Sequence, residues 1–316
     1  MRCGLRECRP LLEAPDSQVQ GSFGLGEVRS VTRQLNEESA VWRVSNRHHH
    51  WGLPVTVLHP ESIASLALER CAFSIRAASC LTGQSSRAAW VTSTVMKLLL
   101  TSGGVSNPSI RQALVGLLDK PIEECTALAI PTAMYGHRNA GPGLNVWNFV
   151  AGRSAQPQVE LGWKSVGLLE LTALPSIPRG AWEPLVRETD VLLFSGGEAV
   201  YLAHWMRESG FVDLLPELTD TVWVGMSAGS MVAAPRIGED FRAWDGGESD
   251  ETLGLVDFSI FPHFEHPMMP GNDAAEFERW AATIDNPAYA LCDDSAVSVV
   301  DGTVEVVSEG QWRYVD

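Results

Sequence analysis

The chain has 316 residues and a formal net charge of −16 at pH 7, and 45% of its residues are hydrophobic. This is the composition of a globular protein with enough apolar residues for a sizeable core. The acidic balance argues against nucleic acid and against an anionic membrane surface as partners, because a polyanion binder needs a basic field.

Membrane insertion and secretion are not expected from the sequence either. No apolar stretch approaches the roughly 20 residues needed to span a bilayer. The N-terminus lacks the basic-then-apolar pattern of a secretory signal. We therefore expect a soluble cytoplasmic protein.

Metal-binding patterns are weak. The six cysteines show no ligand spacing such as Cys-x-x-Cys, and a disulfide framework is not expected at this density. The triplet at 48–50 consists of three histidines without acidic or cysteine partners nearby, so we interpret it as a solvated loop. The sequence predicts neither a metal nor an organic cofactor.

Charge and pattern divide the chain near Met96. Residues 1–95 contain ten Arg, no Lys and eight Asp or Glu, for a net charge of +2, whereas the remainder has a net charge of −18. Residues 1–95 also show little periodicity. From Met96 the sequence MKLLLTSGG is typical of a start methionine followed by a buried strand and a glycine turn. We predict that 96–316 is the functional domain and that 1–95 is a disordered extension or an upstream start artefact.

Within 96–316, apolar strand patterns alternate with helical patterns. The predicted strands are 97–101, 127–130, 166–171, 191–194, 222–224 and 288–292. The predicted helices are 108–118, 145–159, 182–188, 198–209 and 273–284, and a hairpin joins 296–300 to 304–307 around Asp301-Gly302. This alternation predicts an α/β fold in which a mostly parallel sheet has helices on both faces. In such sheets, functional sites form at the carboxyl ends of the strands.

The stretch 221–230, TVWVGMSAGS, carries the clearest chemical signal. An apolar, β-branched run leads into Gly-x-Ser-x-Gly, and the residues after it can continue as a helix. This strand, tight turn and helix would place the hydroxyl of Ser227 on a sharp elbow. The start of the helix also leaves free N–H groups that could hold a developing oxyanion. Ser227 is therefore the candidate nucleophile.

A serine nucleophile needs a base, and the base needs an orienting acid. His263 and His266 are the two histidines after Ser227. We choose His263 as the base, because it follows an apolar run and a proline and should lie at a strand end; for His266 we favour a structural role. The acidic candidates are Asp240, Glu265, Asp293 and Asp294. We favour Asp294, which lies between the strand 288–292 and the final hairpin.

The order of these residues bears on the fold. The order serine, histidine, acid differs from that of α/β-hydrolases, in which the acid precedes the histidine. Choosing Asp240 as the acid would restore the hydrolase order, so that fold stays open as an alternative.

Four segments, in this order, resemble the peptidase E (aspartyl dipeptidase) family of serine peptidases, to which cyanophycinase is related. They are LLLTSGG at 98–104, FSGG at 194–197, GMSAGS at 225–230 and FPHF at 261–264. The resemblance covers essentially all of 96–316 and none of 1–95. It implies the class I glutamine amidotransferase-like fold.

The resemblance also implies roles for individual residues. Ser227 would be the nucleophile and His263 the base, and Asp294 falls at the position of a family glutamate in the late loop. Backbone N–H groups would form the oxyanion hole; they belong to Gly196, Gly197 and Ala228.

Two departures from the family affect substrate preference. Glu198 stands where the family usually has asparagine, so we regard it as a candidate substrate-binding residue whose carboxylate would repel an anionic substrate. The stretch 270–275 contains no basic residue, although the aspartyl dipeptidase has an arginine there. Both departures weaken the expectation of a preference for N-terminal aspartate.

The sequence predicts a serine exopeptidase or dipeptidase that hydrolyses small peptides through an acyl-enzyme, as a monomer or small homo-oligomer. An esterase or amidase on the same triad is an alternative, because acyl transfer does not require a peptide. A catalytically silent amidotransferase-like binding module is another. The spacing of His263 and Glu265 resembles that of amidotransferases, but their nucleophile is cysteine, so a glutaminase is not expected.

Overall fold

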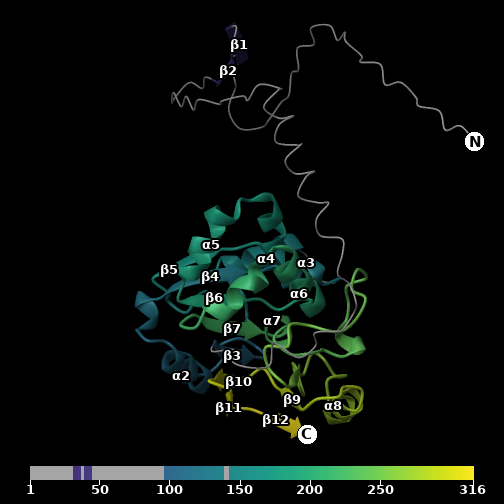
Figure 1. Ribbon diagram of the computed structural model, residues 1–316. Coiled ribbons are helices and arrows are strands. Elements are labelled where there is room, and N and C mark those ends of the chain that lie inside the picture. Colours follow the sequence, from purple (N-terminus) through teal and green to yellow (C-terminus); the bar gives the residue numbers. More distant parts are fainter. Residues whose placement is uncertain (1–30, 37–38, 45–95, 139–141) are drawn as a thin grey trace, which may run out of the picture. The chain divides into compact units, whose positions relative to one another are not determined.

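The computed structural model describes residues 31–36, 39–44, 96–138 and 142–316 (Figure 1). The chain divides into two compact units, Met1–Gln84 and Ser85–Asp316. In the first unit, β1 (Val31–Asn36) pairs antiparallel with β2 (Ser39–Val44). No strand was predicted in this unit from the sequence. The histidine triplet at 48–50 lies outside the described residues.

The second unit is built on a seven-stranded sheet with the order β11-β10-β3-β7-β6-β4-β5. The five strands from β3 to β5 in this order are parallel, and β10 is antiparallel to both of its neighbours. The strands are β3 (Lys97–Thr101), β4 (Thr126–Ile130), β5 (Ser165–Leu168), β6 (Val191–Phe194), β7 (Val222–Met226), β10 (Ser295–Val300) and β11 (Thr303–Ser308). The predicted α/β fold with a mostly parallel sheet is confirmed.

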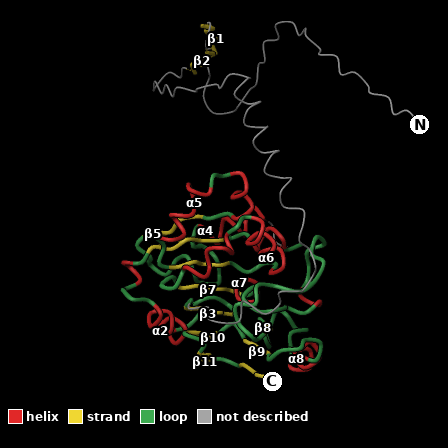
Figure 2. The backbone as a smooth tube through the Cα atoms, viewed as in Figure 1, coloured by secondary structure: helices red, strands yellow, loops and turns green. Residues whose placement is uncertain are grey.

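The strands of the main sheet have apolar side chains on both faces, and this explains why helices pack against both faces. On β3, Leu98 and Leu100 belong to one buried core and Leu99 belongs to the other. The first core includes side chains of α5 (Arg179–Arg187), α6 (Ala199–Glu208) and α7 (Ala228–Met231). The second includes side chains of α2 (Pro108–Leu117) and α4 (Pro142–Val150). In Figure 2 the strands lie side by side through the middle of this unit, with helices around them.

A second sheet, which was not predicted from the sequence, lies beside α8 (Ala274–Ala281). Its order is β12-β9-β8, with β8 (Ser259–Phe261), β9 (Ala288–Leu291) and β12 (Trp312–Val315). Phe261 of β8 packs with Phe277 and Trp280 of α8 in a separate small core. β9 was predicted, and β8 lies in the apolar run before His263 that was expected to end as a strand, whereas β12 was missed. β8 positions the candidate base, because His263 follows it.

The C-terminal hairpin brings another part of the site into place. Asp301 and Gly302 both have positive φ, 49° and 76°, as a two-residue type I′ turn requires. The hairpin's first strand, β10, pairs with β3, and the N–H of Ser102 donates to the carbonyl of Ser295 at 3.2 Å. The segments that follow β3 and β9 therefore lie side by side.

The remaining regular elements are short. They are α3 (Ala133–Gly136), η1 (Ile122–Glu124), η2 (Leu171–Ser176), η3 (Phe211–Glu217) and η4 (Glu239–Phe241). Among the helices that the described residues form, none is long and apolar enough to cross a membrane.

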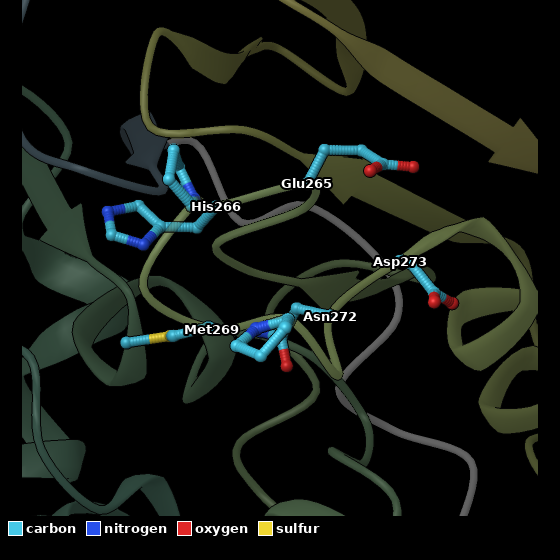
Figure 3. Close-up of a pocket in the computed structure, with 7 residues that line it drawn as sticks. Glu265, His266, Met269, Asn272 and Asp273 are labelled. Atoms are coloured by element: carbon cyan, nitrogen blue, oxygen red, sulfur yellow. The ribbon is translucent and has the colours of Figure 1, made fainter.

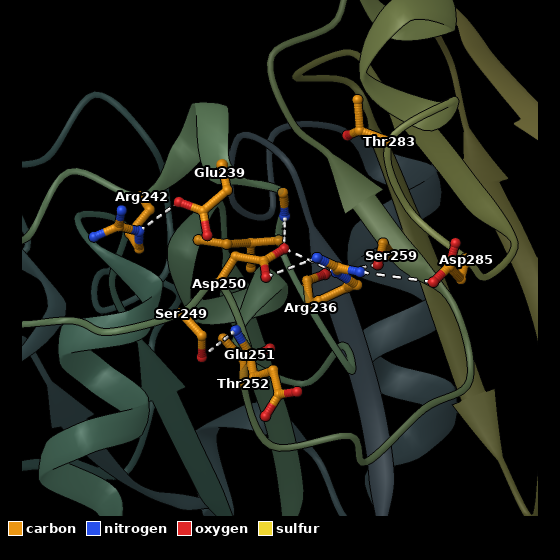
Figure 4. Close-up of polar contacts among 12 residues, drawn as sticks. Arg236, Glu239, Arg242, Ser249, Asp250, Glu251, Thr252, Ser259, Thr283 and Asp285 are labelled. Atoms are coloured by element: carbon orange, nitrogen blue, oxygen red, sulfur yellow. Dashed lines mark hydrogen bonds and ion pairs between the residues drawn. The ribbon is translucent and has the colours of Figure 1, made fainter.

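A buried ion pair braces the loop between α7 and β8 (Figure 4). The Asp250 side chain is 3% exposed, and both of its oxygens accept hydrogen bonds from Arg236 at 2.9 Å. The N–H of Gly238 donates to the same carboxylate at 2.8 Å. The carbonyl of Arg236 accepts from the Ser259 hydroxyl at 2.7 Å, which ties this loop to β8. The brace therefore supports the strand that leads to His263.

Candidate active site

Ser227 follows β7 and has an unusual backbone conformation, with φ 49° and ψ −112°. A residue with a side chain rarely adopts positive φ, and such strain persists only where the surroundings hold it. The N–H of Ser227 donates to the carbonyl of Thr101 at 3.0 Å, and the Ser230 hydroxyl donates to the same carbonyl at 2.7 Å. The end of β3 thus holds the elbow in place.

Both glycines of the elbow are needed for close packing. A Cβ at Gly225 would lie 2.4 Å from the carbonyl oxygen of Gly229, so the start of α7 could not pack against β7. A Cβ at Gly229 would lie 2.5 Å from the carbonyl oxygen of Phe194 on β6. Real Cβ atoms do not approach backbone atoms this closely. The Gly-x-Ser-x-Gly pattern therefore follows from the geometry of the turn.

His263 lies two residues after β8 and also has positive φ, 56°. Its Nε2 atom is 3.1 Å from the Oγ of Ser227, a hydrogen-bonding distance for a nucleophile and its base. The backbone N–H of His263 donates to the hydroxyl of Ser102 at 2.8 Å, which fixes the position of the backbone that carries the ring. The structure thus brings together the serine and the histidine that were selected from the sequence.

The acid beside His263 is Asp293 and not the predicted Asp294. The Oδ1 of Asp293 lies 2.6 Å from the Nδ1 of His263. Asp294 is exposed, and its backbone carbonyl accepts from the side-chain amide of Asn107 at 2.9 Å. β9 ends at Leu291, one residue earlier than predicted, and Asp293 lies in the turn between β9 and β10.

The other acidic candidates lie in other surroundings. Asp240 forms an ion pair with Arg279 at 3.1 Å, and Glu265 is exposed. The hydrolase order that Asp240 would have restored is therefore not the arrangement in the structure.

Ser102 is a residue of the site that sequence reasoning missed. Its hydroxyl is buried, donates to Asp293 Oδ1 at 3.2 Å and accepts from the N–H of His263. One side chain thus contacts both the base and the acid. A Cβ at the neighbouring Gly103 would lie 2.7 Å from the Cβ of Asp293, so glycine is needed there for the carboxylate to approach. The available sequence signal was the TSGG turn after β3, whose pattern suggests no chemical role for the serine.

The surroundings of Asp293 favour its ionised form. Burial raises the pKa of Asp293, but the hydrogen bonds from His263 and Ser102 outweigh that effect, so the net pKa is below the ordinary value. An ionised acid at neutral pH can hold the imidazole through Nδ1 and stabilise the imidazolium that forms when His263 takes a proton.

Three backbone N–H groups in the turns that follow β6 and β7 have no acceptor among the described residues. They belong to Gly196, Gly197 and Ala228. A Cβ on Gly196 would lie 3.5 Å from the Cβ of Ser227, so this glycine adjoins the nucleophile. Gly197 has φ +138°, and a Cβ there would lie 2.2 Å from the carbonyl oxygen of Ala133. These N–H groups are the geometric candidates for an oxyanion hole.

Glu198 does not present its carboxylate to a substrate, contrary to the prediction. The residue is 1% exposed and caps α6, where its side chain accepts from the N–H of Tyr201. Its other oxygen accepts from the backbone N–H groups of Ala243 and Trp244 at 3.2 and 3.4 Å. The carboxylate therefore joins the start of α6 to the loop that follows η4. Its expected repulsion of anionic substrates has no support in this geometry.

A small pocket is lined by residues of the segment that follows His263 (Figure 3). Its volume is about 210 Å³, and its lining includes Glu265, His266, Met269, Asn272 and Asp273. Among the residues that the structure describes, no group of three or more His, Cys, Asp or Glu side chains is arranged to hold a metal ion.

Comparison with known proteins gives the family. The model of peptidase family S51 matches residues 98–307, about two thirds of the chain. The chain therefore belongs to peptidase family S51. The match begins in β3 and ends in β11, so it includes Ser227, His263 and Asp293.

Comparison with solved structures gives two further proteins to which this chain is similar. One is a Listeria monocytogenes EGD-e protein assigned as a peptidase E, with 18% sequence identity and a TM-score of 0.50, covering 68% of this chain and 99% of that one. The other is a peptidase from an acI-B1 Actinobacterium, with 21% identity and a TM-score of 0.49, covering 69% of this chain and 89% of that one. A comparison with curated proteins found no match.

Proposed function

We propose that the chain is a serine peptidase that cleaves small peptides, as an exopeptidase or dipeptidase. The observation that carries the proposal is the continuous contact from Ser227 Oγ through His263 to Asp293, at 3.1 and 2.6 Å. Membership of a peptidase family supports peptides as the substrate class.

In this mechanism the Nε2 of His263 takes the proton of the Ser227 hydroxyl as Oγ attacks the carbonyl carbon of the scissile bond. The N–H groups of Gly196, Gly197 and Ala228 stabilise the negative oxygen of the tetrahedral intermediate. His263 then donates its proton to the leaving amine, and the acyl group remains on Ser227. A water molecule, deprotonated by His263, attacks the acyl-enzyme and releases the acid product.

The acid has an electrostatic role. Asp293 keeps the Nδ1 of His263 protonated, so that Nε2 is the free acceptor facing Ser227. It also stabilises the imidazolium that forms each time His263 takes a proton. Because its pKa is lowered, Asp293 stays ionised at neutral pH.

A dipeptide library screen with the full chain and Ser227→Ala tests the proposal. We expect the variant to lose activity by at least about 10³-fold with its fold intact, because removing the nucleophile ends acyl-enzyme formation. Ser176→Ala is the matched control, because the Ser176 hydroxyl is exposed and donates to the carbonyl of Ala173. A Ser227→Ala variant that cleaves at the wild-type rate would remove the proposal. Activity on simple esters alone would favour an esterase.

A further inference from the structure

A second histidine contacts the candidate acid through its other oxygen. The Nε2 of His266 lies 3.5 Å from the Oδ2 of Asp293, whereas His263 and Ser102 contact Oδ1. The His266 side chain is 27% exposed and also lines the small pocket (Figure 3). Both oxygens of the carboxylate therefore face a nitrogen or hydroxyl group of the protein.

A hydrogen bond to the ring of His266 determines which of its two nitrogens carries the proton. The backbone N–H of Met268 donates to the Nδ1 of His266 at 3.1 Å. A ring nitrogen that accepts a hydrogen bond carries no proton, so the proton of the neutral ring is on Nε2. The contact between His266 and Met268 thus leaves the proton on Nε2, the ring nitrogen that lies 3.5 Å from Asp293 Oδ2, a polar contact longer than an ordinary hydrogen bond.

We propose that His266 is a positioning residue for the triad: its Nε2–H holds the Oδ2 of Asp293, so that Oδ1 faces the Nδ1 of His263. This inference rests on the proposed function. A carboxylate held at one oxygen can rotate about its Cβ–Cγ bond, whereas contacts at both oxygens fix its plane. Fixing the plane of Asp293 fixes the imidazole of His263, and with it the distance from Nε2 to Ser227 Oγ.

A pair of substitutions separates this role from a merely structural one. In His266→Asn, the amide oxygen stands near the position of Nδ1 and can keep the Met268 contact, but nothing reaches Asp293. In His266→Gln, the longer side chain can place an amide N–H group near the position of Nε2. His266→Asn therefore keeps the contact with Met268, and His266→Gln keeps the contact with Asp293.

The measurement is the rate of labelling of the full chain by a fluorophosphonate, which reports the reactivity of Ser227 without a known substrate. We expect His266→Asn to lower the maximal labelling rate about fivefold, because Asp293 loses its polar contact at Oδ2, with little change in probe affinity. His266→Gln should stay within about twofold of the wild type. The reverse ranking, or wild-type rates in both variants, would overturn the inference.

A spectroscopic signal decides the case in which both variants are slow. The proton between His263 Nδ1 and Asp293 should give a low-field proton resonance, because that contact is short, 2.6 Å. A shift or loss of this resonance in His266→Asn, with an otherwise unchanged spectrum, supports the positioning role, and an unchanged resonance overturns it. A wild-type chain whose Ser227 does not react contradicts the proposed function itself.

Discussion

Asp293 and Asp294 are adjacent in sequence, yet only Asp293 contacts the base. Its Oδ1 lies 2.6 Å from His263, whereas the Asp294 side chain is exposed. In an asparagine at position 293, the NH₂ group cannot accept a hydrogen bond from Nδ1 of His263. The neutral amide also does not stabilise an imidazolium as a carboxylate does. The two residues therefore offer a matched test of which one is the acid.

We expect Asp293→Asn to lower kcat by about 10³- to 10⁴-fold and Asp294→Asn to leave kcat within about twofold, since only the first changes the partner of the base. Steady-state kinetics on an active dipeptide, with circular dichroism as the check on folding, measures both. An equal loss of kcat in the two variants would contradict the assignment of Asp293 as the acid that orients His263.

Ser227 and His263 could be selected from the sequence because each follows an apolar run that ends in a turn. The acid was missed by one position, because periodicity does not determine which residue of a short turn points inward. Glu198 was misplaced for a related reason: its sequence neighbours place it at the site, but its side chain turns back to cap α6. Ser102 was missed because its role depends on contacts with residues more than 150 positions away.

The elbow between β7 and α7 illustrates how an element constrains its residues. Gly229 lies against the backbone of β6, where an added Cβ would be 2.5 Å from the Phe194 carbonyl oxygen. Gly116, in α2, would have nothing within 4 Å of an added Cβ and so offers a matched comparison.

We expect Gly229→Ala to lower the free energy of unfolding by about 1–3 kcal/mol or more, because the backbone must shift to admit the methyl group. Gly116→Ala should instead raise it by up to about 1 kcal/mol, since alanine is the better helix former. Urea unfolding followed by circular dichroism measures both changes. A Gly229→Ala variant as stable as the wild type would show that the elbow tolerates a side chain at this position.

Elements of the main sheet were predictable because their apolar runs and glycine turns are long enough to show a pattern. Residues 97–101 and 191–194 were predicted with the bounds that β3 and β6 have. The helix predicted over 145–159 ends at Val150, because Gly152 has a positive φ, 63°, which is typical of the residue that ends a helix. The second sheet depends on pairing between short segments distant in sequence, which local pattern does not encode.

At the scale of the whole molecule, buried carboxylates determine how stability depends on pH. Burial raises the pKa of Asp250, but hydrogen bonds from Arg236 and from the Gly238 N–H lower it, so the net pKa is below the ordinary value. A carboxyl group whose pKa is lowered by folding binds protons more weakly in the folded state than in the unfolded state. Its stabilisation is therefore complete above the unfolded pKa of about 3.9 and is lost as the pH falls toward the folded value.

We expect Asp250→Asn to lower the free energy of unfolding by about 2 kcal/mol at pH 7, because Arg236 loses a charged, buried partner. The difference from the wild type should narrow as the pH falls below about 4. Asp245→Asn is the control, because Asp245 pairs with Arg138 at the surface with its side chain 89% exposed, and it should have a negligible effect. Denaturant unfolding at a series of pH values measures both variants. Equal free energies of unfolding for the two variants at pH 7 would contradict this expectation.

The division of the chain at Met96 remains a prediction. The family match covers 98–307 and thus falls within the unit Ser85–Asp316. We propose that 96–316 carries the peptidase activity by itself. The change of net charge from +2 to −18 at this boundary is consistent with two parts of different character.

The central claim is that Ser227 is an activated nucleophile. The most direct measurement is mass spectrometry of the full chain after reaction with a fluorophosphonate, followed by mapping of the modified peptide. We predict a single added phosphonyl group on Ser227, abolished in Ser227→Ala and strongly slowed in His263→Ala. Absence of labelling, or labelling that persists in Ser227→Ala, would contradict the claim.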